Sequence, residues 1–153
     1  MFCSGCGSGL APGHYFTVPI EVCTGCGGCW LEEGRLKWII EIGPKSIPSE
    51  RLKRATRYRI TSKPAYRLDD REVRRIVKCP YCIGVMRPVN YSANSGVAIY
   101  KCTSDHGVWV PKDGIDRLVT FIGTWDRYLR QQGSCFVHLA QFERKRFLRK
   151  ISY

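Results

Sequence analysis

The chain has 153 residues, 44% of them hydrophobic, and a formal net charge of +12. This composition excludes a disordered polar chain, and no window reaches the ~20 apolar residues of a membrane-spanning helix. Met1-Phe2-Cys3 leaves no room for a basic and then apolar signal region, so we expect an intracellular, cytoplasmic protein. In that reducing environment, paired cysteines bind metal more often than they form disulfides.

The positive charge is concentrated in two segments. Residues 44–78 contain twelve basic and four acidic residues, and residues 115–153 contain eight and three. The remaining segments, 1–43 and 79–114, are close to neutral. We therefore expect the two basic segments to hold an anionic partner, either nucleic acid without sequence specificity or an acidic protein.

The chain opens with four cysteines at metal-ligand spacing. Cys3 and Cys6 form one Cys-x-x-Cys pair, and sixteen residues separate it from the second pair, Cys23 and Cys26. One tight turn can direct both thiolates of a pair at one ion, and two turns supply the tetrahedron of a structural zinc site. The pattern predicts zinc. A disulfide pair or a redox-active dithiol is the alternative, but redox chemistry needs one lone, activated pair.

A strand and an aromatic anchor accompany this first set. Apolar residues alternate with the period of a half-buried strand at Phe16, Val18, Ile20 and Val22. We expect Trp30 to pack in the core between helix and ribbon, with base stacking as the minor alternative. Cys29 stands where the second half of the chain has Val108, which favours a small buried hydrophobic residue over a fifth ligand.

A short helix follows the second cysteine pair. Leu36, Ile39 and Ile40 share one helical face, and we expect Gly43-Pro44 to end the helix. In the joining segment, residues 49–54 suggest a short helix, and residues 56–61 and 73–78 suggest strands. Basic residues interleaved with tyrosines suit a phosphate backbone, although a solvated basic face is equally compatible. The candidate nucleic-acid-binding residues here are Arg51, Lys53, Arg54, Arg57, Arg59, Arg74 and Arg75.

A second ligand set begins at Cys79 and Cys82, and nineteen residues separate it from Cys102. We expect the tip of the intervening hairpin at 90–96. The fourth ligand is open: sequence register favours Asp105, whereas zinc chemistry favours His106, because carboxylates are rare in closed structural sites. A site that has lost its zinc is the third alternative. No obvious base and pocket accompany the cysteines, so we expect no enzymatic activity.

The second set belongs to an internal repeat. Adding 79 to a residue number relates Cys23 to Cys102, Gly28 to Gly107, Trp30 to Trp109 and Leu36 to Ile115. The repeat departs from this register at the last ligand, where Cys26 falls on Asp105. The chain therefore contains two copies of one small metal-binding unit.

Both copies resemble the transcription factor IIB-type zinc ribbon family. The first copy has Cys3, Cys6, Cys23, Cys26, Gly28, Trp30, Leu31, Glu32, Gly34 and Leu36, and the second has Cys79, Pro80, Cys82, Cys102, Gly107, Trp109, Val110 and Ile115. The resemblance covers about half of the chain and implies zinc and a ribbon fold. It implies no activity, because such ribbons contact DNA, RNA and proteins alike. The sequence departs from the family pattern at Asp105 and at Arg35.

The C-terminal residues predict helices. One apolar helical face is formed by Ile115, Leu118, Val119, Ile122, Trp125 and Leu129. Gly133 is a plausible stop, and a second helix over 135–151 would carry Arg144, Lys145 and Arg146. We interpret that second helix as a docking element that also contributes to nucleic-acid binding. An ordinary helical hairpin and a membrane-surface helix are the alternatives.

The sequence thus predicts a small, metal-stabilised α+β protein with two zinc β-ribbons, each followed by a helix, and a C-terminal helical arm. The expected divisions are a first ribbon (1–43), a basic joining segment (44–78), a second ribbon (79–122) and the arm (123–153). We expect a non-enzymatic protein with two Zn²⁺ ions that contacts nucleic acid. The alternative is an adaptor subunit of a larger protein or ribonucleoprotein assembly.

Overall fold

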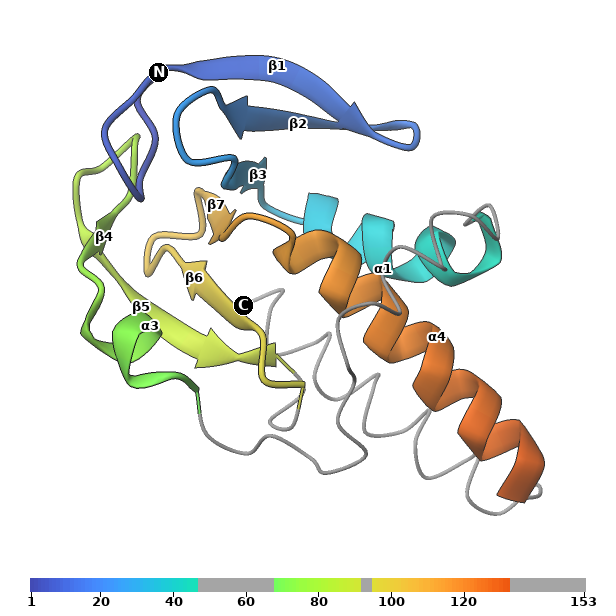
Figure 1. Ribbon diagram of the computed structural model, residues 1–153. Coiled ribbons are helices and arrows are strands. Elements are labelled where there is room, and N and C mark those ends of the chain that lie inside the picture. Colours follow the sequence, from blue (N-terminus) through green and yellow to red (C-terminus); the bar gives the residue numbers. More distant parts are fainter. Residues whose placement is uncertain (47–67, 92–94, 133–153) are drawn as a thin grey trace.

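A computed structural model describes residues 1–46, 68–91 and 95–132 of the chain (Figure 1). Its strands form one seven-stranded antiparallel sheet in the order β1-β2-β3-β7-β6-β5-β4. The strands are β1 (Leu10–Tyr15), β2 (Val18–Cys23), β3 (Cys29–Glu32), β4 (Val77–Lys78), β5 (Val85–Asn90), β6 (Ala98–Lys101) and β7 (Gly107–Val110). The described helices are α1 (Arg35–Ser46), α3 (Asp70–Arg74) and α4 (Gly114–Gln132). The fold is therefore α+β, as expected.

The sheet is continuous through both repeats, so the prediction of two separate ribbons is corrected. The strands β3 and β7 pair antiparallel at the centre of the sheet, with Trp30 directly opposite Trp109. The short segment after the second cysteine pair provides this pairing, because its two central residues in each repeat are buried and apolar. Each ribbon thereby gains a neighbouring strand from the other repeat.

The two repeats have the same order of elements. The helices α1 and α4 begin at Arg35 and Gly114, which are 79 residues apart. For the residues that precede the hairpin of each repeat, equivalent positions are 76 residues apart, because the second hairpin is three residues longer. The isolated bridge between Phe2 and Gly9 accordingly corresponds to the pair Lys78–Val85 of β4 and β5. The duplication thus includes the turn of the first cysteine pair as well as that of the second.

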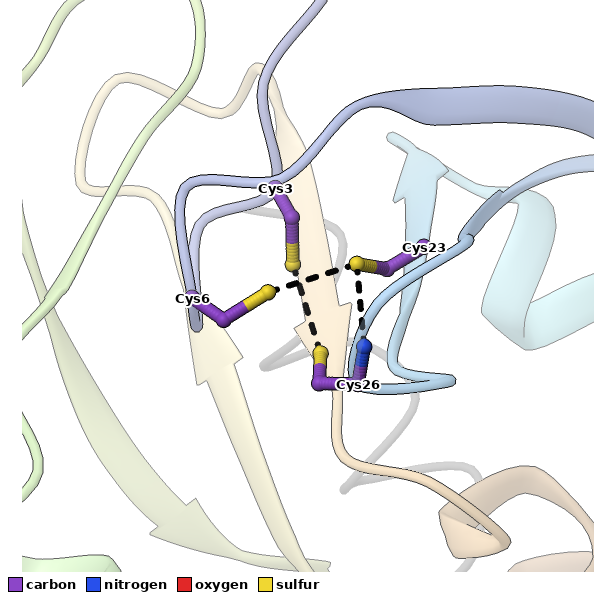
Figure 2. A group of neighbouring side chains, drawn as sticks. All are labelled: Cys3, Cys6, Cys23 and Cys26. Atoms are coloured by element: carbon purple, nitrogen blue, oxygen red, sulfur yellow. Dashed lines mark hydrogen bonds between the residues drawn. The ribbon is translucent and has the colours of Figure 1, made fainter.

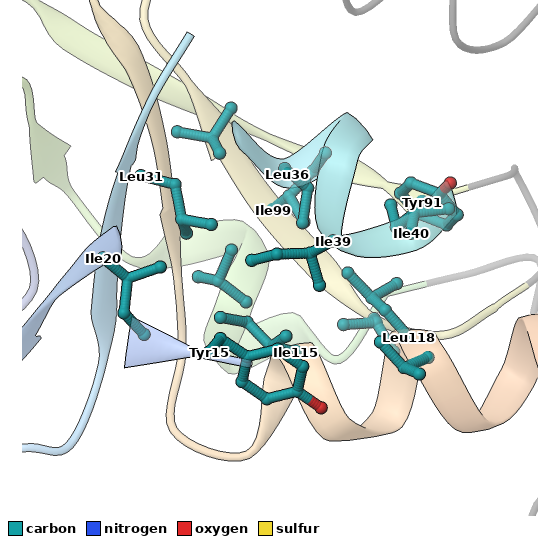
Figure 3. Close-up of a cluster of buried hydrophobic side chains, with 14 of the residues drawn as sticks. Tyr15, Ile20, Leu31, Leu36, Ile39, Ile40, Tyr91, Ile99, Ile115 and Leu118 are labelled. Atoms are coloured by element: carbon teal, nitrogen blue, oxygen red, sulfur yellow. The ribbon is translucent and has the colours of Figure 1, made fainter. Parts of the chain in front are cut away.

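The helices α1 and α4 lie side by side on one face of the sheet (Figure 1). The core between them and the sheet is apolar, and Figure 3 shows strand and helix side chains directed into it. Val18 and Ile20 contribute from β2, and the predicted helical faces are buried as far as Ile122. The helical residues are Leu36, Ile39, Ile40, Ile115, Leu118, Val119 and Ile122. The side chains of Trp125 and Leu129, which complete the second predicted face, lie outside the described residues. The strand prediction is wrong at Phe16, which lies in the hairpin turn with φ 53°.

The predicted end of the first helix is wrong, because α1 continues through Gly43-Pro44 to Ser46. Gly43 has a packing role instead. A Cβ placed on it would lie 2.9 Å from Cγ1 of Val119 in α4, so the absent side chain allows the two helices to approach closely. Pro44 falls in the last turn, where it removes only one hydrogen bond near the helix end.

The joining segment also differs from the prediction, because only Val77 and Lys78 of the expected strand 73–78 are in a strand. Residues 70–74 instead form α3. Its N-cap is Asp69, whose Oδ1 accepts a hydrogen bond from the N–H of Arg71 at 2.8 Å. An aspartate at this position satisfies one of the unpaired N–H groups of a helix start, so the cap outweighs the strand preference of Val73.

The other face of the sheet carries both tryptophans. Trp30 and Trp109 are 1% and 0% exposed, and they form a second cluster with Tyr100 and buried cysteines of both sets. The expected core role of Trp30 is confirmed, and its burial excludes base stacking. The expected position between helix and ribbon is wrong, because Trp30 faces away from the helix-covered core. Alternation along β3 explains this, since its neighbour Leu31 points toward the helices.

A proline lies at each side of the sheet where a strand has no outer neighbour among the described strands. Pro12 lies in the edge strand β1, and Pro88 lies in β5 beyond the end of the two-residue strand β4. The two prolines are 76 residues apart and therefore equivalent. Proline lacks an N–H, so it is tolerated in strands only where no neighbour needs that donor.

Several predictions lie outside the described residues. These are the helix 49–54, the strand 56–61 and the second C-terminal helix 135–151, together with residues 92–94 at the second hairpin tip. The proposed divisions of the chain stay predictions. Among the helices of the described ranges, none has both the length and the apolar character that crossing a membrane requires.

Candidate metal centres

The four thiols of the first repeat converge on one point. Figure 2 shows the sulfur atoms of Cys3, Cys6, Cys23 and Cys26 directed toward one another. All four lie within 4.8 Å of one another, with 3.6 Å between Cys3 and Cys26 and 3.4 Å between Cys6 and Cys23. Zn–S bonds of about 2.3 Å at tetrahedral angles place sulfurs about 3.8 Å apart, so the donors fit zinc. All four are free thiols, well beyond the ~2.05 Å of a disulfide.

Backbone N–H groups support the first site. Gly5 donates to the sulfur of Cys3, and Gly25 donates to the sulfur of Cys23, each at 3.3 Å. Gly7 then closes the first turn with its N–H on the carbonyl of Cys3, at φ 79°. Such N–H groups stabilise the charged thiolate, which is the form that binds metal.

The second site has three thiols and one imidazole. The sulfur of Cys102 lies 3.6 Å from that of Cys82 and 3.4 Å from Nδ1 of His106, and the sulfur of Cys79 lies 3.7 Å from the same nitrogen. The four donor atoms lie within 4.8 Å of one another. The ring of Tyr81 stacks on the imidazole, with centroids 5.7 Å apart. The set fits a closed Cys₃His zinc site.

The structure brings His106 to the thiols and turns Asp105 away from them. The N–H of Asp105 donates to the carbonyl of Cys102 at 3.2 Å, which closes the turn one residue earlier than in the first repeat, where Gly27 closes it. Asp105 has φ 54°, and its carboxylate pairs with Lys101 at 3.0 Å with 49% of the side chain exposed. The next residue therefore takes the ligand position.

The thiols of each set differ in acidity. Hydrogen bonds from Ser8 lower the pKa of Cys6 to about 6, and a backbone hydrogen bond lowers the pKa of Cys82 to about 6. Burial raises the pKa of Cys26 to about 12 and that of Cys79 to about 11. Each set of thiols thus combines an exposed, acidic thiol with a less acidic one, whose proton must leave when a metal binds.

Cys29, which the sequence predicts to be a small buried residue, lies outside both ligand sets. It is half-buried against the helix-covered core, and its sulfur lies 3.8 Å from the carbonyl oxygen of Gly27. Burial raises its pKa to about 11, and the nearby charge of Asp116 adds to the effect. These surroundings suit a small hydrophobic residue rather than a ligand.

Of the candidate nucleic-acid-binding residues, the structure describes Arg74 and Arg75. Arg74 is exposed at the end of α3. Arg75 pairs with Glu72 at 3.1 Å, and its guanidinium lies 5.5 Å from the ring centroid of Trp109. Arg75 is therefore engaged in fastening α3 to the sheet. The others lie outside the described residues, and they are Arg51, Lys53, Arg54, Arg57, Arg59, Arg144, Lys145 and Arg146.

Two residues on the sheet face that carries the tryptophans were not predicted from the sequence. Tyr81 bridges Trp30 and His106, and Tyr100 donates its hydroxyl to the Glu72 carboxylate at 2.7 Å. Tyr81 lies between the two cysteines of a pair, where the equivalent residue is Gly5, so the repeat gave no signal for it. The contact of Tyr100 joins residues 28 positions apart, beyond the reach of local patterns.

No protein-family model, no curated protein and no solved structure shows a significant match to this chain.

Proposed function

We propose that the protein is a non-enzymatic zinc-binding protein with two structural Zn²⁺ sites. The observation that carries this proposal is the presence of two closed sets of four donors, Cys₄ and Cys₃His, in one fold. Four protein ligands leave no position for substrate or activated water, whereas catalytic zinc sites keep one open. The relationship to zinc ribbons of the transcription factor IIB type is part of the proposal, supported by the repeated Cys-x-x-Cys and Gly-x-Trp residues.

The zinc proposal predicts that folding and metal binding are one process. The pure chain should contain two zinc ions by elemental analysis, and a strong chelator should abolish its near-UV circular dichroism. The aromatic signal is a direct reporter, since Trp30 and Trp109 are both buried beside the ligand sets. A zinc-free protein that keeps this signal would contradict a structural role.

The finer proposal is that the zinc-stabilised sheet presents its basic segments to nucleic acid. The net charge of +12 and its concentration in 44–78 and 115–153 support it. Exposed basic residues of the described part, Arg71, Arg74 and Lys78, extend this charge onto the edge of the sheet near β4. Phosphate contacts of this kind give affinity without sequence preference.

The nucleic-acid proposal is tested by binding to a mixed-sequence DNA duplex and an RNA of equal length. If several phosphates are neutralised, affinity should fall steeply between 50 and 200 mM salt, by about 10³-fold for six contacts. Replacing Arg71 and Arg74 with glutamate reverses their charge and should weaken binding. The matched control is Lys112→Glu, a charge reversal at an exposed position on the loop before α4. Absence of binding at low salt would refute this part and leave the zinc sites unaffected.

An adaptor subunit is the second candidate, and exposed apolar residues favour it. Phe2, Ile76 and Trp38 are 75%, 73% and 52% exposed. Large apolar side chains at the surface are typical of protein contacts, where a tryptophan in particular contributes much of the binding energy. A salt-insensitive complex that Trp38→Ala disrupts would favour the adaptor, whereas a steep salt dependence favours nucleic acid.

A further inference from the structure

An approximate two-fold axis of the sheet passes between the two tryptophans. Trp30 and Trp109 are equivalent in the repeat, and they are also direct partners in the β3–β7 ladder. The two flanking pairs are also equivalent, because Cys29 lies opposite Val110 and Leu31 lies opposite Val108. Two equivalent strands paired in this way make an isologous contact, like that of a symmetric dimer.

This symmetry exchanges the tryptophans between the repeats. Trp109 belongs to the second repeat, but its indole lies against the first ligand set. A Cβ on Gly5 would lie 2.2 Å from Cζ2 of Trp109, and a Cβ on Gly28 would lie 2.5 Å from the same atom. Gly5 lies between Cys3 and Cys6, and Gly28 follows Cys26 by two residues. The indole therefore contacts both turns that hold the first site.

The reverse contact exists at the second site. The ring of Trp30 lies 5.9 Å from that of Tyr81, which in turn stacks on His106. A Cβ on Gly107, the residue after His106, would lie 3.0 Å from Cζ2 of Trp30. Trp30 thus contacts both turns of the second site, through Tyr81 in one and Gly107 in the other.

Within the described residues, neither indole is held in place by a hydrogen bond. The Nε1 atoms of Trp30 and Trp109 are buried and have no hydrogen-bond partner in the described structure. A buried donor without a partner lowers the stability of the fold. Packing of the large rings against the two sets of turns must offset this cost, which indicates that ring contact is what these residues contribute.

We propose that Trp30 and Trp109 are positioning residues for the metal site of the opposite repeat, so that the two sites bind metal cooperatively. The inference rests on the proposed zinc function. Loading the second site orders Cys102 and His106, and through them Gly107 and the start of β7. That order fixes Trp109, whose indole supports the turns of the first site. Loading of the first site fixes Trp30 in the same way, and the indole of Trp30 supports the turns of the second site.

Cobalt(II) binding to the full chain tests the proposal, because cobalt in a Cys₄ site and in a Cys₃His site absorbs differently and reports each site separately. Trp109→Leu should weaken cobalt binding at the Cys₄ site by about tenfold more than at the Cys₃His site, and Trp30→Leu should show the opposite preference. Cys102→Ser, which removes a ligand of the second site, should also lower affinity at the first site.

The outcomes separate the possible failures. If each substitution weakens mainly the site of its own repeat, or both sites equally, or neither, the proposal is wrong. If a leucine variant does not fold with metal, Trp109→Phe and Trp30→Phe decide by the same crossed pattern. If the unmodified chain binds fewer than two cobalt ions, the proposed zinc function itself fails, which is a distinct result.

Discussion

Gly7 and Ile83 occupy the same position in the first turns of the two metal sites, and both have a left-handed backbone. Their φ angles are 79° and 59°, and each donates its N–H to the carbonyl of the first cysteine in its pair. The turn therefore demands this conformation in both repeats, but only one repeat has glycine there. A β-branched side chain is strained in this region, so Ile83 weakens the second turn.

Replacing Ile83 with glycine should stabilise the protein. The left-handed region costs a non-glycine residue roughly 1–2 kcal/mol, and the side chain of Ile83 is 63% exposed, so little burial is lost. We expect Ile83→Gly to raise the free energy of unfolding by about 1 kcal/mol, measured by denaturant unfolding with zinc bound.

The matched control is Gly7→Ala, which should lower that free energy by a similar amount. No atom of the described residues lies within 4 Å of a Cβ at Gly7, so the conformation alone would cause the loss. Destabilisation by Ile83→Gly would mean that the isoleucine side chain makes a contact that outweighs its strain.

A methyl group on Gly28 should destabilise the protein strongly. Its Cβ would lie 2.5 Å from the buried ring of Trp109, which cannot move without disturbing β7. Overpacking of this kind costs about 1–3 kcal/mol. Gly9→Ala is the control, because nothing in the described part of the chain lies within 4 Å of a Cβ there. Thermal unfolding of the two zinc-loaded variants should show a clear loss for the first and little change for the second.

Two helical glycines should respond to alanine with opposite signs. Alanine is favoured over glycine by about 1 kcal/mol inside a helix. At Gly43 that gain should be outweighed by contact with Val119 at 2.9 Å, whereas at Gly123 no described atom lies within 4 Å. We expect Gly43→Ala to lower the melting temperature and Gly123→Ala to raise it. Stabilisation at both positions would show that α1 and α4 can separate slightly without penalty.

Substitution at the second site should distinguish its two candidate ligands. His106→Ala should reduce the zinc content from two ions to one, because Nδ1 lies 3.4 Å from the sulfur of Cys102. Asp105→Ala should retain two ions, since that carboxylate pairs with Lys101 instead. Elemental analysis of the dialysed proteins measures this, and the reverse pattern would assign the ligand to Asp105.

Zinc affinity should fall as the pH falls, because the ligands must be deprotonated. The raised pKa values of Cys26 and Cys79, about 12 and 11, mean that zinc must displace their protons at pH 7. Cys6 and Cys82 have pKa values of about 6, so they carry protons that zinc must also displace only when the pH is below about 6. Calorimetry in buffers of different ionisation enthalpy should therefore detect more protons released at pH 5.5 than at pH 7.5.

The metal sets and the helix-covered core follow from local patterns in the sequence. Two cysteines separated by two residues form one turn, and this relation does not depend on the rest of the fold. The alternation at Val18 and Ile20 and the helical spacing from Leu36 to Ile40 likewise concern single elements. Such features are predictable because each residue's role is set by neighbours close in sequence.

The pairing of the two repeats through β3 and β7 could not be predicted from local patterns in the sequence. Four residues from Cys29 to Glu32 are too few to show a periodicity, and their partner strand lies about 79 residues away. The helix α3 was missed because Val73 and Val77 suggested a strand, while the cap at Asp69 lies outside that window. The positions of both tryptophans follow from the β3–β7 pairing, and so they could not be predicted before it.

Pro12 and Pro88 give this duplicated sheet a natural limit to its size. A sheet built about a two-fold axis has two equivalent outer borders, and a copy of the chain that paired at one border would offer the next copy an identical border. Repetition of that step would produce an endless fibre. Pro12 in the edge strand β1, and Pro88 where β5 extends past β4, each remove a donor from the row that an incoming strand would need. The same duplication that doubled the ribbon therefore also doubled its protection against fibre formation.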